Sequence, residues 1–175
     1  MHQPRDREAV PRRLRERRTR ARVAPRRVHE PEVRDRVARR IADLGYSLPS
    51  HRKMDEKKMG ADLHMKHPSL RHFFTVECKG DGKGEARDAK MEVGIHSAFA
   101  QILLRYSTHN GRKYGLAFPY HWKRRVLGKL SAPVVELLRL NLFFVPEERL
   151  ARIEHLTPTL VKKEIAAVQH RTNSE

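Results

Sequence analysis

The sequence contains few of the features that mark secreted or membrane proteins. It has one cysteine in 175 residues, which excludes an intramolecular disulfide framework and leaves any zinc site to histidines and carboxylates. No apolar run approaches the ~18 residues that a membrane-spanning helix needs. We therefore expect a soluble, cytoplasmic protein with no membrane partner. Aromatic residues make up only 6% of the chain, which argues against a surface that stacks many bases.

Negative charge is also scarce beside positive charge. Lys and Arg total 38 against 21 Asp and Glu, so the formal net charge is +17, which favours a polyanionic partner, nucleic acid before an anionic membrane. Residues 1–29 hold 11 arginines, no lysine and 3 acidic residues, without apolar periodicity. We interpret residues 1–29 as a disordered Arg-rich arm that contacts nucleic-acid phosphates; a solvated tail or a wrongly assigned translation start is the alternative.

The rest of the chain is long enough for one domain at 30–156, followed by a C-terminal helix and tail at 157–175. Helices are predicted by apolar residues three to four apart, over 31–44, 86–108, 122–140 (broken near Pro133) and 158–170. Strands are predicted by short apolar runs, over 46–52, 61–67, 72–79, 114–119 and 142–145. We therefore predict an α/β fold with a mixed central sheet flanked by helices, in the order α-β-β-β-α-β and then α-β-α.

A carboxylate and an ammonium group lie in the most apolar of these strands. Glu77 and Lys79 are two residues apart, so both side chains leave the same face of the strand. Asp62 lies on the preceding strand, and a hairpin between the two strands brings it toward Glu77. Two converging carboxylates form an oxygen site suited to Mg²⁺ or Mn²⁺. Lys79 beside them is placed to position or deprotonate an attacking water, or to neutralise transition-state charge.

The motif of Asp62 followed by Glu77-Cys78-Lys79, on consecutive strands after a leading helix, resembles the PD-(D/E)xK nuclease superfamily. Members of that superfamily share the restriction-endonuclease-like fold, in which a helix, three antiparallel strands, a helix and a further strand follow one another. The resemblance covers about half of the chain, from about 31 to 119. It implies a restriction-endonuclease-like core and a Mg²⁺-dependent phosphodiesterase activity, with Mn²⁺ as the alternative ion.

The resemblance also implies roles for single residues. Asp62 and Glu77 are expected to bind the metal, the backbone carbonyl of Cys78 to complete its shell, and Lys79 to serve the attacking water. Many members add a glutamate from the first helix, which makes Glu32 a candidate metal ligand, ahead of Asp35 and Glu30.

Members related to recombination exonucleases add a glutamine on the helix after the motif and a tyrosine four residues later. Gln101 lies on the polar stripe of the predicted helix 86–108, so we include it among the catalytic candidates. Tyr106, however, is five residues further on and lies on the apolar stripe. This departure speaks against the exonuclease subfamily, and we favour an endonuclease.

Basic residues around the motif are candidates for contacts with the nucleic-acid backbone. The segment Gly80–Gly84 follows a strand and precedes a helix, but a dinucleotide-binding fingerprint would need glycine at position 85, which is Glu85. We interpret this segment as a flexible loop beside the active site. The basic residues on it and on the following helix are the candidate nucleic-acid contacts: Lys83, Arg87, Lys90 and Arg105.

The segment Tyr120–Arg125 mixes aromatic and basic residues and has two interpretations. Its side chains stack on a base or follow phosphates, or a half-buried Trp122 simply anchors the next helix. The sequence alone leaves both open.

Together these features predict a metal-dependent deoxyribonuclease that hydrolyses phosphodiester bonds in DNA. The residues do not distinguish DNA from RNA as the substrate. A homodimer fits, because cutting two strands is simplest with two sites. The alternative is a non-catalytic, basic nucleic-acid-binding or assembly protein. That alternative leaves Asp62 and Glu77 unexplained, since carboxylates repel a polyanion. A purely structural ion pair between Glu77 and Lys79 on a solvent-facing sheet is the remaining interpretation.

Overall fold

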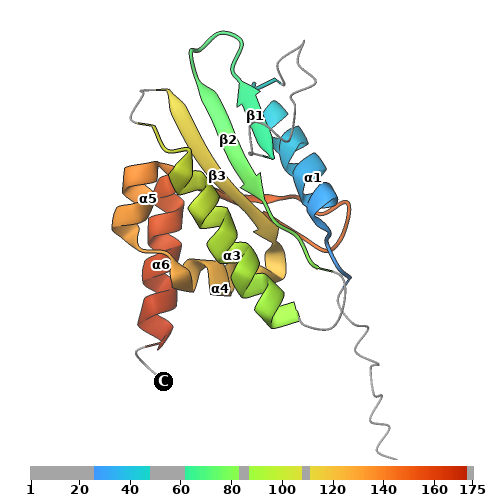
Figure 1. Ribbon diagram of the computed structural model, residues 1–175, viewed down its shortest axis with the longest axis vertical. Coiled ribbons are helices and arrows are strands. Elements are labelled where there is room, and N and C mark those ends of the chain that lie inside the picture. The colour runs from blue at the N-terminus through green and yellow to red at the C-terminus, as the bar shows by residue number, and fades with distance from the viewer. Residues whose placement is uncertain (1–25, 48–61, 83–86, 108–110, 173–175) are drawn as a thin grey trace, which may run out of the picture.

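The computed structural model describes residues 26–47, 62–82, 87–107 and 111–172 (Figure 1). Its helices are α1 (Glu30–Ala42), α3 (Arg87–Leu104), the 3-10 helix η1 (Tyr120–Trp122), α4 (Lys123–Lys129), α5 (Ala132–Leu138) and α6 (Pro158–Thr172). Its strands are β1 (Leu63–Lys66), β2 (Phe73–Cys78), β3 (Arg112–Pro119), β4 (Leu140–Val145) and β5 (Glu154–Leu156). No helix within these residues is long and apolar enough to cross a membrane.

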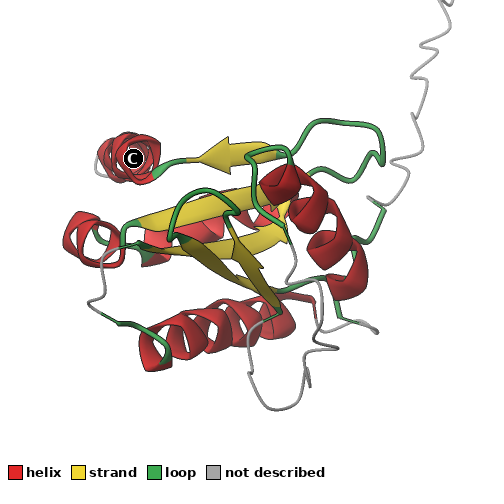
Figure 2. Cartoon of the chain, turned by 90° about the horizontal axis from the view of Figure 1, so that it is seen from above, coloured by secondary structure: helices red, strands yellow, loops and turns green. Residues whose placement is uncertain are grey.

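The five strands form one mixed sheet in the order β1-β2-β3-β4-β5. The central strands β2, β3 and β4 are parallel, and β1 and β5 run antiparallel to their neighbours at the two edges. The predicted hairpin is confirmed, with Leu63 opposite Val76. Of the predicted strand 46–52, only the first two residues are described, and Ser47 forms an isolated bridge with Lys66. The mixed sheet flanked by helices is therefore the predicted α/β architecture (Figure 2).

Helix boundaries follow local signals in the sequence. Pro31 lies in the first turn of α1 together with Glu30 and Glu32, and these carboxylates complement the positive end of the helix dipole. Gly45 follows α1 with φ +88°, a conformation that glycine adopts without a steric penalty. The predicted break in 122–140 is confirmed, since α5 begins with Pro133 in its first turn.

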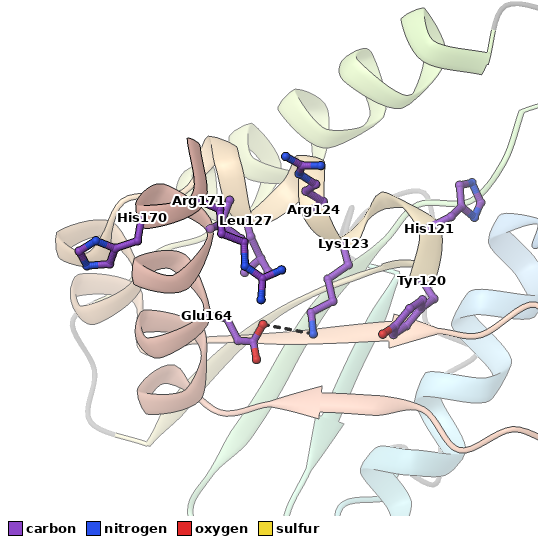
Figure 3. A pocket seen from close by; sticks show the side chains of 9 residues that line it. Tyr120, His121, Lys123, Arg124, Leu127, Glu164, His170 and Arg171 are labelled. Atoms are coloured by element: carbon purple, nitrogen blue, oxygen red, sulfur yellow. Dashed lines mark ion pairs between the residues drawn. The ribbon is translucent and has the colours of Figure 1, made fainter. Parts of the chain in front are cut away.

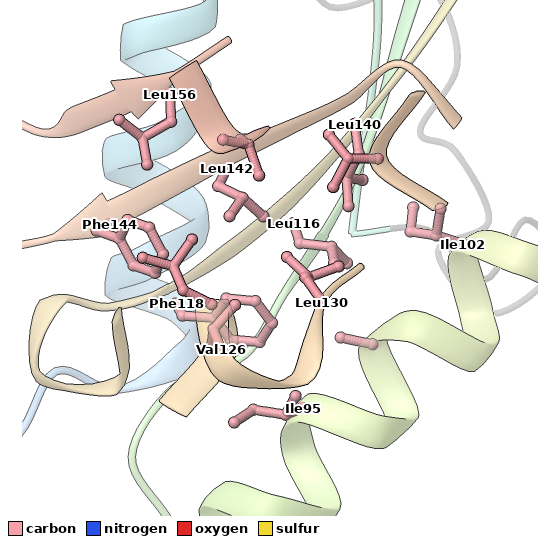
Figure 4. Packing of buried hydrophobic residues seen from close by; sticks show 14 of the residues in the cluster. Ile95, Ile102, Leu116, Phe118, Val126, Leu130, Leu140, Leu142, Phe144 and Leu156 are labelled. Atoms are coloured by element: carbon pink, nitrogen blue, oxygen red, sulfur yellow. The ribbon is translucent and has the colours of Figure 1, made fainter. Parts of the chain in front are cut away.

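Each face of the sheet buries its own hydrophobic core. The alternation along β2 sends Phe74, Val76 and Cys78 toward α1, where they pack with Val33 and Val37. The opposite face packs against α3, α4, α5 and α6 (Figure 4), through a set of fully buried side chains that includes Ile95, Ile102, Leu116, Phe118, Leu140, Leu142 and Phe144. A polar side chain on the second face of β2 is therefore enclosed, because helices cover that face.

The folded part begins before residue 30, earlier than the predicted boundary. Val28 is fully buried among the residues that pack against α1. Its amide N–H donates to Asp81 Oδ2 at 2.8 Å, and Arg26 pairs with Glu32. The last four residues of the predicted arm are thus part of the domain, whereas residues 1–25 lie outside the described residues.

Candidate active site

Glu77 is the buried charge of the sheet. It lies next to the carboxyl end of β2, and only 1% of its surface is exposed. One carboxylate oxygen, Oε1, accepts from Lys79 Nζ at 2.6 Å, and the other, Oε2, accepts from Arg105 Nη1 at 3.3 Å. Glu77 and Lys79 share a face of the strand as predicted. The interpretation of a solvent-facing ion pair is wrong, however, because Glu77 is enclosed rather than solvated.

Asp62 reaches the same end of β2 from the neighbouring chain segment. It directly precedes β1, and its Oδ2 accepts from the Cys78 amide N–H at 2.7 Å. The Asp62 side chain thus adds a hydrogen bond between the two chain segments beyond the last paired residues of β1 and β2, Leu63 and Val76. The structure therefore brings the carboxylates of Asp62 and Glu77 together, in line with the expectation from the hairpin.

Cys78 contributes its backbone to this end of the sheet and its side chain to the core. The thiol is completely buried on the α1 face, and burial raises its pKa well above the usual value, so it is a packing group. Within a strand, the N–H and C=O of one residue lie on the same edge. The Cys78 carbonyl accordingly points to the edge from which Asp62 approaches.

Charges at the site shift the titration of both members of the motif. Burial raises the pKa of Glu77, the Lys79 hydrogen bond opposes that shift, and the Asp62 charge adds to it. Burial lowers the pKa of Lys79, but the carboxylates of Glu77, Asp62 and Glu30 outweigh it, so its pKa lies above the usual value. Lys79 is consequently a protonated hydrogen-bond donor to Glu77 at neutral pH.

The helix after the motif supplies a second cation and an amide. Arg105 follows α3 and donates to the Gln101 backbone carbonyl at 3.0 Å as well as to Glu77. The Gln101 side-chain oxygen accepts from Arg105 Nη2 at 3.4 Å. Gln101 thus joins the cluster through Arg105. Arg105, predicted as a nucleic-acid contact, pairs with the Glu77 carboxylate.

The two glutamates of the first helix have different surroundings. Glu32, the favoured metal candidate, lies between Arg26 and Arg36, and Arg36 donates to the Pro146 and Ala151 carbonyls. Glu30, ranked lower, is the one whose charge acts on Lys79. The structure therefore brings Glu30 rather than Glu32 to the motif.

The segment after β2 explains why the start of α1 lies here. A Cβ on Gly80 would come within 2.1 Å of the Glu30 backbone nitrogen, so only glycine allows this approach. Asp81 then accepts from the Val28 amide through Oδ2, and its Oδ1 accepts from Trp122 Nε1 at 3.3 Å. Hydrogen bonds of Asp81 thus connect Gly80–Gly82 to the start of α1 and to η1. Residues 83–86, which include the rest of the predicted loop, lie outside the described residues.

The remaining predicted contacts are placed only in part. Lys83 lies outside the described residues, and Arg87 begins α3 with its side chain not described. Lys90 is exposed, and its stem lies against Gly82. Trp122 is 3% exposed, which confirms the anchoring interpretation of that residue.

Two contributions to the site were missed by reasoning from the sequence. The ion pair between Arg105 and Glu77 joins residues 28 positions apart, and the only local signal was the four-residue spacing of Gln101 and Arg105 on one helical stripe. The Asp81 contacts join three distant segments and had no signal in spacing at all. Comparison with family models, with curated proteins and with solved structures finds no match to this chain.

Proposed function

We propose that this protein is a metal-dependent nuclease that hydrolyses phosphodiester bonds in DNA, as an endonuclease. The observation that carries the proposal is Glu77, a carboxylate buried in an apolar sheet beside a second carboxylate and two cations. Burying charges costs more than apolar packing of the same volume, so stability does not explain the cluster. Clusters of buried groups with perturbed pKa values are typical of active sites.

The donors at this site fit a hard divalent cation. The carboxylates of Asp62 and Glu77 and the Cys78 carbonyl are oxygen ligands, and Mg²⁺ commonly uses one or two carboxylates and completes its shell with water and substrate phosphate. No group of three or more His, Cys, Asp or Glu side chains gathers as a metal site among the described residues. Water would thus complete the shell of Mg²⁺ or Mn²⁺ until substrate phosphate replaces part of it, and the ion when bound would polarise the phosphate and acidify a bound water.

The protein's own cations have a distinct task in this proposal. Lys79, held protonated by three carboxylates, donates hydrogen bonds to the attacking water or to the phosphate as negative charge develops. Arg105, 3.3 Å from Glu77 Oε2, is the second donor available to the phosphate. Gln101 positions Arg105 through the hydrogen bonds between them.

The order of elements supports a restriction-endonuclease-like core. A leading helix, the β1–β2 hairpin, a helix and a parallel strand follow one another in α1, β1, β2, α3 and β3. The motif residues lie at the end of β2, as the resemblance implies. The net charge of +17 supports DNA as the partner, and a homodimer remains part of the proposal.

The experiment that tests this function is incubation of supercoiled plasmid with the full chain at low salt, with Mg²⁺, Mn²⁺ or EDTA. We expect metal-dependent nicking that disappears in Lys79→Ala. Lys163→Ala, which removes an exposed charge on α6, is the matched control and should cleave as the wild type does. Binding without cleavage of plasmid, linear, branched or RNA substrates under either metal would contradict the proposal.

A non-catalytic nucleic-acid-binding protein is the second candidate, and one observation favours it. Both Glu77 oxygens already contact cations of the protein itself, so the charge is balanced without a metal. This candidate predicts that Glu77→Gln binds DNA as well as the wild type or better, with no cleavage by either.

A further inference from the structure

A pocket lined by the η1–α4 segment and α6 lies outside the candidate active site. It has a volume of about 860 Å³ and opens between the η1–α4 segment and α6 (Figure 3). Its volume is typical of sites for small ligands. One wall carries Tyr120 and Arg124, and the α6 wall carries Glu164 and Arg171.

The walls combine an aromatic ring with guanidinium groups. Tyr120 is 47% exposed, although aromatic side chains of this size usually bury most of their surface. Arg124 and Arg171 are exposed, and no ion pair engages either of them within the described part of the chain. Lys123, in contrast, is neutralised by Glu154 at 2.8 Å and by Glu164 at 3.3 Å. Lys123 Nζ also lies over the Tyr120 ring, 5.9 Å from its centroid. The two arginines and the part of the ring that Lys123 does not cover are thus left to meet a ligand.

Hydrogen bonds connect this pocket to the end of the nuclease motif. His121 lines the pocket, and its Nε2 lies 3.1 Å from Asp81 Oδ1. Asp81 follows Lys79 by two residues and also accepts from Trp122. The η1 wall of the pocket is therefore fixed against the segment that follows Lys79.

We infer that this pocket holds an unpaired nucleotide of the substrate strand, with the base on Tyr120 and the phosphates on Arg124 and Arg171. The inference rests on the proposed function and names its substrate class, a nucleic acid with a single-stranded segment beside the bond that is cut. Aromatic faces bind bases of any sequence, and a groove of positive charge follows the backbone. A base inside a duplex is stacked and paired and cannot enter such a pocket without being extruded.

Fluorescence anisotropy in EDTA tests the inference on the full chain without any cleavage. The probes are a short labelled oligothymidylate and a labelled hairpin duplex. Tyr120→Leu should weaken binding of the single strand about tenfold, whereas Tyr120→Phe, which keeps the ring, should bind as the wild type does. Arg124→Ala and Arg171→Ala should each reduce the single-strand salt slope by about 0.7. Lys163→Ala, on α6 outside the pocket, should leave affinity within twofold.

Three results would overturn the inference. One is equal weakening of duplex and single strand by Tyr120→Leu, and another is a loss in Lys163→Ala as large as in Arg171→Ala. The third is that free thymidine monophosphate competes as well as the oligothymidylate does when both are supplied at the same nucleotide concentration. The ligand of the pocket would then be a free nucleotide. Because no cleavage is measured, failure of the nuclease proposal leaves these outcomes unchanged, and the two can be told apart.

Discussion

Among the described residues, each face of the sheet carries a buried polar cluster, and the two lie at opposite ends of its parallel strands. One is the Glu77 cluster at the end of β2, with its carboxylate and two cations. The other surrounds Asn141 near the start of β4, on the face that packs against α1. Asn141 is 6% exposed, donates to the backbone carbonyls of Tyr114 and Arg139, and accepts from His155 at 3.0 Å.

The difference between them is charge. The Asn141 cluster satisfies its buried amide with neutral partners, and His155 stacks on Phe143 with ring centroids 4.5 Å apart. Burial lowers the pKa of His155 to about 4, and Arg40 and Lys113 add to the shift, so the ring is neutral at pH 7. Such a cluster specifies strand register at little cost. The Glu77 cluster encloses a full charge, which a fold does not need for register. This difference supports a structural role for the Asn141 cluster and the proposed catalytic role for the Glu77 cluster.

The largest expected effect is on activity, from Lys79→Ala and Glu77→Gln. In the proposed function each change removes a group that would act on the phosphate or the metal, so the cleavage rate should fall by at least about 100-fold. Removing one member of a buried charge cluster costs up to about 3–5 kcal/mol, so the free energy of unfolding in urea is measured for each variant and the cleavage rate is expressed per folded molecule. If the variants are only less stable and each folded molecule still cleaves at the wild-type rate, the Glu77 cluster has a structural role like the Asn141 cluster.

Gly80→Ala tests the close packing between the start of α1 and the segment that follows the Glu77 cluster. In Gly80→Ala the new methyl group would meet the backbone of His29 and Glu30, so either the start of α1 moves or the protein loses about 2–3 kcal/mol. Urea denaturation measures the loss. Gly128→Ala is the matched control: a Cβ there has no heavy atom within 4 Å, and a helical alanine should stabilise by about 0.5–1 kcal/mol. Equal effects of the two variants would contradict the close approach of α1.

The structural cluster is tested by Asn141→Leu. The change leaves two backbone carbonyls and the His155 ring without the amide, so the free energy of unfolding should fall by about 2 kcal/mol. The double variant Asn141→Leu/His155→Phe should recover part of that loss, since both partners are then apolar. Cleavage per folded molecule should not change. A specific loss of cleavage would contradict the separation of the two clusters.

The smallest effect is a pH dependence carried by His155. The unfolded ring takes up a proton near pH 6.5 and the folded ring only near pH 4, so its contribution is complete above pH 6.5 and is lost as the pH falls toward 4. Between pH 7 and pH 5 the wild type should lose about 1 kcal/mol more than His155→Gln, after allowance for partial exposure. Urea titrations at both pH values measure this. His96→Gln, an exposed histidine on α3, should lose as much as the wild type.

The periodicity of apolar and polar residues along the chain predicts much of the fold correctly. Alternation along one strand placed Glu77 and Lys79 on one face, and the spacing of Val33, Val37 and Ile41 predicted α1, which buries these three residues. Strand β5 was missed because it has three residues, of which Glu154 and His155 are polar. Its pairing with β4 depends on tertiary contacts that no local pattern records.

The candidate site shows the limit of such reasoning. Glu30 and Glu32 are two residues apart on one helix, so they face different directions. Which of them meets Lys79 depends on how α1 docks against Gly80 and Asp81. Likewise, the polar stripe on α3 predicted where Arg105 would lie but not that it would contact Glu77, because the rotation of α3 over the sheet is set by core packing.

The most direct test of the central claim is Mn²⁺ binding to the full chain, measured by electron paramagnetic resonance without any nucleic acid. We expect one bound Mn²⁺ per chain at millimolar metal or below, lost in Asp62→Asn and in Glu77→Gln and retained in Lys79→Ala. Binding that is the same in the wild type and both carboxylate variants, or no binding by the wild type, would contradict a metal centre at the end of β2.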